Sequence, residues 1–113
     1  MKLNTPDGSS FLGNLTTVGR VSGKTHTVKL RLVLHEGNFY ASRRNADGGW
    51  LKNIVRNPSA LIEVNGEQIE CLAELLNDVK LSQKISELKY RDKRREEKRV
   101  VVRLIPGKRP ESQ

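Results

Sequence analysis

The sequence predicts one small, mainly β domain in which six antiparallel strands and two helices form a closed or nearly closed barrel. Apolar and polar residues alternate with period two over residues 12–42, as they do in half-buried strands. An Asn-Gly pair at 65–66, between the apolar stretches ALIEV and EQIECLAELL, indicates a further hairpin. A chain of 113 residues has the length of one domain. We therefore take residues 1–113 as a single unit, with flexible tails at 1–10 and 107–113.

The first three strands follow one another as a meander. They are expected over residues 12–19, 25–34 and 39–42, with turns at VSGK and HEGN. Because successive strand residues point to opposite faces, the second strand divides into two sets of side chains. One face carries Leu30, Leu32 and Leu34, and the other carries Lys29, Arg31 and Val33.

Helical spacing interrupts the strands twice. The segment DGGWLKNIVRNP predicts a short helix, which Asp47 caps and the Asn-Pro pair ends. A longer amphipathic helix is expected over residues 78–98, where apolar residues recur every three or four positions. The two strands of the Asn-Gly hairpin lie between these helices. The run RVVVRLI supplies the sixth strand, which a Pro-Gly pair ends.

Positive charge is spread unevenly: most of the surplus lies in residues 80–113, and a second basic stretch spans residues 12–59. The chain has a formal net charge of +8, and residues 12–59 hold eight Lys or Arg against two acidic residues, so an anionic ligand is expected. No apolar run approaches the roughly 20 residues that cross a bilayer, and the N-terminus lacks a secretory apolar stretch, so we expect a cytoplasmic protein. Cys71, the single cysteine, fits a small buried side chain in a reducing compartment, and no metal site is predicted.

The GRVSGK turn has the composition of a phosphate-binding loop. Arg20 offers a planar fork of donors, Lys24 a point charge, Ser22 a hydroxyl and Gly23 a backbone N–H. These groups together predict a cradle for an anion. The alternative is an ordinary hairpin turn whose charges are solvated.

Two stretches, TTVGRVSGK and ASRRNADGGWLKNIVRNPSALIEV, resemble the deazaflavin-dependent nitroreductase family. The shared pattern is a TT-x-GR-x-SG turn, an AS dipeptide ending the third strand, and a W-x-x-N-[IL]-x-x-NP helix followed by an apolar strand. The resemblance implies a split barrel, commonly a homodimer, that binds FMN or an 8-hydroxy-5-deazaflavin coenzyme. It also implies hydride transfer to a small organic acceptor, of the nitroreductase or quinone reductase type.

A second group of candidate cofactor-binding residues lies around the end of the third strand. Ser42, Arg43 and Arg44 precede the N-terminus of the short helix, where unpaired N–H groups attract anions. Trp50 would pack near the edge of a flavin-type ring, and Asn53 would hydrogen-bond it. The alternatives are that the arginines are simply solvated and that Trp50 anchors the core. Lys29 and Arg31 rank second as groove-lining residues.

Two other functions stay open at this point. The segment KYRDKRREEKR is the reason to consider a basic small-barrel module for single-stranded nucleic acid, for which we expect at most weak, salt-sensitive binding. Tyr90 alone accompanies these charges, and acids three or four positions away from the bases favour a solvated, ion-paired helix instead. The other alternative is a flavin-binding protein without turnover, since a flavin-type cofactor carries its own redox chemistry.

Overall fold

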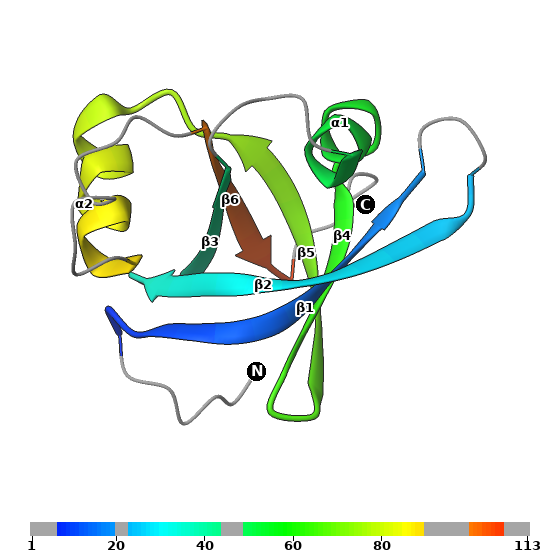
Figure 1. Cartoon of the computed structure of the whole chain (residues 1–113), viewed down its shortest axis with the longest axis horizontal. Coiled ribbons are helices and arrows are strands. Elements are labelled where there is room, and N and C mark those ends of the chain that lie inside the picture. Colours follow the sequence, from blue (N-terminus) through cyan, green and yellow to red (C-terminus); the bar gives the residue numbers. More distant parts are fainter. Residues whose placement is uncertain (1–6, 20–22, 44–48, 90–99, 108–113) are drawn as a thin grey trace.

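A computed structural model of the chain describes residues 7–19, 23–43, 49–89 and 100–107. Its six strands close into one antiparallel barrel in the order β1-β2-β3-β6-β5-β4 (Figure 1). The predicted mainly β fold with two helices is confirmed. The elements are β1 (Ser10–Val18), β2 (Thr25–His35), β3 (Asn38–Arg43), α1 (Gly49–Arg56), β4 (Ser59–Val64), β5 (Glu67–Leu75), α2 (Val79–Lys89) and β6 (Val100–Pro106).

β1 and β2 form a long hairpin that is part of the barrel through both of its outer edges. The two strands pair from Ser10 opposite Val33 to Val18 opposite Thr25. The other edge of β1 pairs with β4. The end of β1 and the start of β2 extend past α1, on the side of the barrel away from α2 (Figure 1).

Apolar side chains fill the interior of the barrel. Leu15, Phe39 and Leu104 are fully buried there. Gly13 allows β1 to pass close to β4, because a Cβ at this position would lie 3.1 Å from the carbonyl oxygen of Glu63. Since side chains occupy the interior, a cofactor would have to bind on the outside of the barrel.

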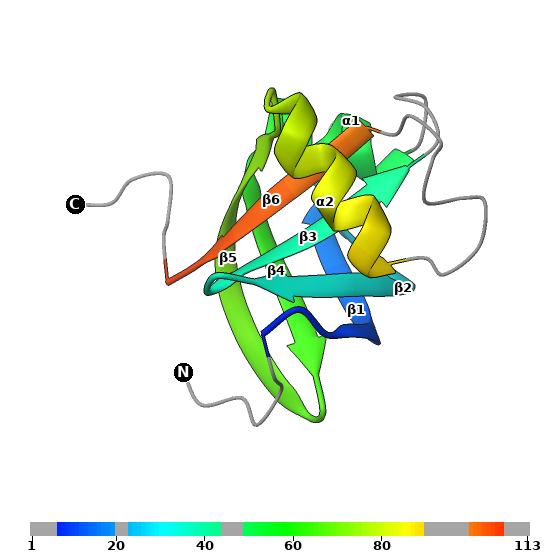
Figure 2. The same ribbon diagram turned by 90° about the vertical axis from the view of Figure 1, so that its left-hand side faces the viewer.

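α2 covers the outer face of β2, β3 and β6 (Figure 2). Ile85 of this helix forms a second apolar cluster with Val33, Tyr40 and Val101. Val33 shares a face of β2 with Lys29 and Arg31, as predicted. It is nevertheless fully buried, whereas Lys29 and Arg31 are exposed. The difference arises because α2, which is distant in sequence, packs over one end of this face only.

Asp78 caps the N-terminus of α2. Its Oδ1 accepts a hydrogen bond from the backbone N–H of Leu81 at 3.0 Å, and its carbonyl oxygen accepts one from Ser82 at 2.9 Å. The helix is described as far as its bound at Lys89. Residues 90–99 lie outside the described ones, and with them the predicted continuation of this helix and its basic, nucleic-acid-type segment.

The described chain is hydrogen-bonded to the barrel near both of its ends. The N–H of Gly8 donates to the carbonyl oxygen of Leu34 at 2.6 Å, and the N–H of Gly107 donates to that of Glu70 at 2.8 Å. The predicted tails overlap with these bonded residues. Their outer parts, 1–6 and 108–113, lie outside the described residues. Within the described ranges, neither helix has the length and hydropathy that a membrane span requires.

Candidate functional site

The C-terminal end of β3 brings two of the predicted site residues to the rim of the barrel. Ser42 and Arg43 are the last residues of this strand, and both are half-buried. Their backbones pair with Val101 and Val100 at the start of β6. The strand end expected from sequence is therefore confirmed. Pairing with β6 fixes the backbone positions of Ser42 and Arg43.

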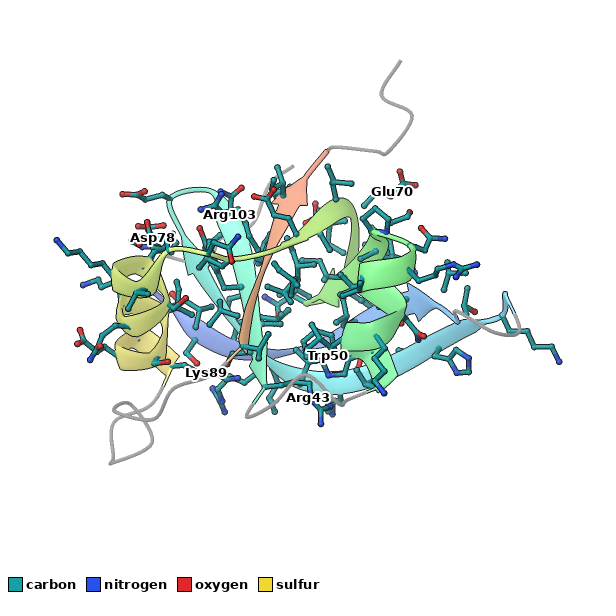
Figure 3. All side chains as sticks on the ribbon, turned by 90° about the horizontal axis from the view of Figure 1, so that it is seen from above. Arg43, Trp50, Glu70, Asp78, Lys89 and Arg103 are labelled. Atoms are coloured by element: carbon teal, nitrogen blue, oxygen red, sulfur yellow. The ribbon has the colours of Figure 1, made fainter. Side chains whose placement is uncertain are left out.

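Lys89, the last residue of α2, reaches the same rim (Figure 3). Its Nζ donates a hydrogen bond to Oγ of Ser42 at 2.9 Å. An ammonium group has donors only, so the Ser42 oxygen must accept this bond. Sequence reasoning missed Lys89, because 47 residues separate it from Ser42 and only the docking of α2 unites them.

Arg43 carries a buried donor at this rim. Its Nε is inaccessible to solvent and has no hydrogen-bond partner among the described residues. A buried polar group left without a partner costs roughly 1–3 kcal/mol, and more when it is charged, so the position calls for an acceptor. A phosphate or carboxylate oxygen would supply one. The residues present therefore fit an anionic group.

Trp50 and Asn53 anchor α1 to the barrel. Trp50 is 9% exposed and belongs to the apolar cluster that fills the barrel. The Nδ2 of Asn53 donates to Oγ1 of Thr17 at 3.1 Å, and both side chains are buried. The structure thus places these two residues in the contact between α1 and β1. Their predicted contacts with a cofactor ring stay predictions.

The described part of the GRVSGK turn is closed by its own backbone. The N–H of Gly19 donates to the carbonyl oxygen of Lys24 at 2.7 Å, and the N–H of Gly23 donates to that of Gly19 at 3.0 Å. The backbone donor expected from Gly23 therefore serves the turn itself. Lys24 is exposed, and Gly23 has a φ of +75°, which favours glycine. Arg20 and Ser22 lie outside the described residues.

The remaining charged candidates lie apart from the rim of β3. Lys29 and Arg31 are exposed on the β1–β2 hairpin, where NH1 of Arg31 lies 3.4 Å from Oγ of Ser10. Arg44 falls in the segment 44–48, outside the described residues, together with the expected cap of α1. The structure therefore brings Lys89 to Ser42, whereas Arg43, the next residue of β3, lies on the opposite face of the strand. The second-ranked pair is not added.

Cys71 is a small buried side chain, as expected. Burial raises the pKa of its thiol to about 12, so it carries no thiolate near neutral pH. Its Sγ contacts the carbonyl oxygen of Ile69 at 3.6 Å. Among the described residues, no three His, Cys, Asp or Glu side chains group together as metal ligands would.

An open groove of about 600 Å³ lies at the opposite end of β3 and β6. The β2–β3 turn, the start of β5 and the end of β6 form it, and Glu67 and Glu70 supply carboxylates. Its volume would admit a small molecule, but its charge is the wrong sign for an anion. The rim at Ser42 and Arg43 is therefore the better candidate for an anionic cofactor.

Solved structures of other proteins share this barrel fold at low sequence identity. A candidate pyridoxamine 5′-phosphate oxidase from Listeria innocua has a TM-score of 0.69 at 18% identity, over 86% of this chain and 84% of that one. A conserved hypothetical protein from Mycobacterium tuberculosis has a TM-score of 0.70 at 20% identity, over 89% and 76%. An F420 reductase has a TM-score of 0.59 at 17% identity, over 86% of each chain.

Within this fold, the sequence identifies a particular family. The model of the F420H(2)-dependent quinone reductase family matches residues 2–102, which is most of the chain. The chain therefore belongs to this family, and the resemblance to deazaflavin-dependent reductases is confirmed. Family membership supports an oxidoreductase of the flavin or deazaflavin type. No curated protein matches the chain in sequence.

Proposed function

We propose that this protein binds the deazaflavin coenzyme F420 and uses it to transfer hydride to a small quinone, with nitroaromatic compounds as a second class of acceptor. The observation that carries the proposal is the buried Nε of Arg43, which has no hydrogen-bond partner among the described residues. Family membership supports the deazaflavin rather than FMN, which stays the alternative cofactor.

The proposed work of the chain is to hold and orient the cofactor. When bound, the deazaflavin itself supplies the hydride chemistry, so a protein nucleophile is unnecessary. Arg43 would donate to an anionic oxygen through Nε. The hydrogen bond between Asn53 and Thr17 fixes α1, which offers a rigid wall beside this rim.

We propose further that a second copy of the chain completes the site. The interior of the barrel is filled, so the cofactor has only an outer groove. The β1–β2 hairpin extends away from α2, whereas Ser42 is bonded to the last residue of α2 (Figures 1 and 3). Light scattering should give the mass of a dimer, and a strictly monomeric protein that still binds F420 tightly would rule out this arrangement.

Binding and turnover test the proposal separately. We expect the purified protein to quench the fluorescence of coenzyme F420 on titration, and to oxidise reduced F420 when a small quinone is added. If F420 binds but reduced F420 is not oxidised, the protein is a cofactor-binding protein without reductase activity. No binding of F420, with tight binding of FMN instead, would overturn the choice of cofactor. Cytoplasmic localisation, expected from the sequence, is part of the same proposal.

A further inference from the structure

The strands β2, β1 and β4 are neighbours in the barrel and share an outer face. We call the middle of this surface the β1 face; its residues are Leu12, Asn14, Thr16, Lys29, Leu61 and Glu63. Of the two described helices, α1 meets β1 through the inward-facing Thr17, and α2 covers β2 around Val33. Leu12 is left 55% exposed. The β1 face is therefore accessible to a partner.

Opposite charges occupy the two edges of the β1 face. Asn14 pairs with Lys29 of β2 on one side and with Glu63 of β4 on the other. Lys29 and Glu63 are both exposed, and Nδ2 of Asn14 lies 3.5 Å from Oε1 of Glu63. Two strand spacings, about 10 Å in all, separate the backbones of the two charged residues. The β1 face thus carries a base along β2, an acid along β4 and neutral side chains along β1 between them.

A twofold axis parallel to β1 would make this face complementary to itself. Rotation by 180° about such an axis exchanges the two edges, so Lys29 of each copy faces the partner's Glu63. The neutral residues of β1 then lie on the axis and meet their own copies, with Leu12 adding apolar surface away from the charged edges. The strands of the two sheets stay nearly aligned, which is a common way for sheets to pack face to face.

We infer that a second copy of the chain docks on the β1 face. A polyanion would match the edge of β2 but would meet the exposed carboxylate of Glu63 at the edge of β4. A partner with both charges in reversed order matches both edges, and a second copy has that order by symmetry. This inference rests on the proposed function in one respect, because that proposal already requires a second copy; the face that the copy covers is new.

The test reverses each charge alone and then mixes the two variants. Lys29→Glu sets a carboxylate against the partner's Glu63, and Glu63→Lys sets an ammonium group against the partner's Lys29. Each variant alone should raise the dimer Kd at least tenfold, because like charges then face each other at two symmetric positions. An equimolar mixture should form a heterodimer within about threefold of the parent's affinity, since both contacts again join opposite charges. Sedimentation equilibrium without F420 measures these constants, with circular dichroism to verify the fold.

Lys84→Glu and Glu87→Lys are the matched controls, because they make the same charge changes at exposed positions of α2. Neither should change the dimer Kd by more than about twofold. A parent dimer that survives both reversals on the β1 face, or reversed variants that stay apart when mixed, would overturn the inference. A monomeric parent would overturn it together with the proposed second copy. A parent that dimerises as predicted but binds no F420 would overturn the proposed function and leave the docking face in place.

Discussion

The two ends of the β3–β6 pair differ in charge although the same strands build both. At one end, Ser42, Arg43 and Lys89 present donors and positive charge. At the other end, the groove contains the carboxylates of Glu67 and Glu70. Figure 3 shows Arg43 and Glu70 on opposite sides of the molecule. Volume favours the groove as a ligand site, and charge favours the rim.

Opposite charges at the two ends of one strand can direct an anionic ligand to one end of a small barrel. From Asn38 to Arg43, β3 spans about 16 Å at about 3.3 Å per residue. This distance exceeds the Debye length of about 8 Å at physiological salt. The acidic groove therefore repels an anion locally without weakening the rim, and substitutions at the two ends should act independently.

The largest effect is expected from Arg43→Met, which removes the buried Nε donor. Hydrogen bonds to charged groups contribute roughly 1.5–3 kcal/mol, so F420 affinity should fall by about ten- to a hundredfold. Fluorescence titration measures this, with circular dichroism to verify the fold. Arg31→Met, at an exposed arginine of the β1–β2 hairpin, is the control. Equal affinities of the Arg43 and Arg31 variants would remove the rim from the site.

A smaller loss is expected from Arg20→Ala in the GRVSGK turn. This change should weaken F420 binding about tenfold if its guanidinium contacts the anionic part of the cofactor, and Lys24→Ala should cost less, because Lys24 is exposed. The same titration tests both variants. Unchanged affinity in a folded Arg20→Ala protein would restrict the anion site to the rim of β3.

The smallest effect is expected at the acidic end. Neutralising the groove with Glu67→Gln and Glu70→Gln together should change F420 affinity by no more than about twofold, because screening over this distance is nearly complete. The measurement should be repeated at low salt, where a modest gain is expected. A loss of binding comparable to that of Arg43→Met would show that the groove, rather than the rim, holds the cofactor.

Much of the fold could be predicted from the sequence because its signals are local. Period-two alternation located the meander, and the Asn-Gly pair located the β4–β5 turn, where Asn65 has a φ of +54° and Gly66 one of +80°. The burial of Val33 was not predictable in this way. It depends on Ile85 of α2, and no local pattern on β2 reports which helix will cover it.

The candidate site shows the same limit. Ser42 and Arg43 could be predicted, because a strand that ends before a helix is a common place for ligands. Lys89 could not, since its place beside Ser42 follows from the docking of a helix 47 residues away. The turn was predicted with Gly23 as a donor to ligand, whereas its N–H bonds to the carbonyl oxygen of Gly19. The composition of a loop shows which hydrogen-bonding groups it contains, but not which groups they will bond to.

A crystal structure of the protein with coenzyme F420 bound tests the central claim most directly. The account predicts an anionic oxygen of the coenzyme within about 3 Å of Nε of Arg43. A coenzyme seated in the groove beside Glu67 and Glu70, with Nε of Arg43 bonded to another part of the protein, would contradict it.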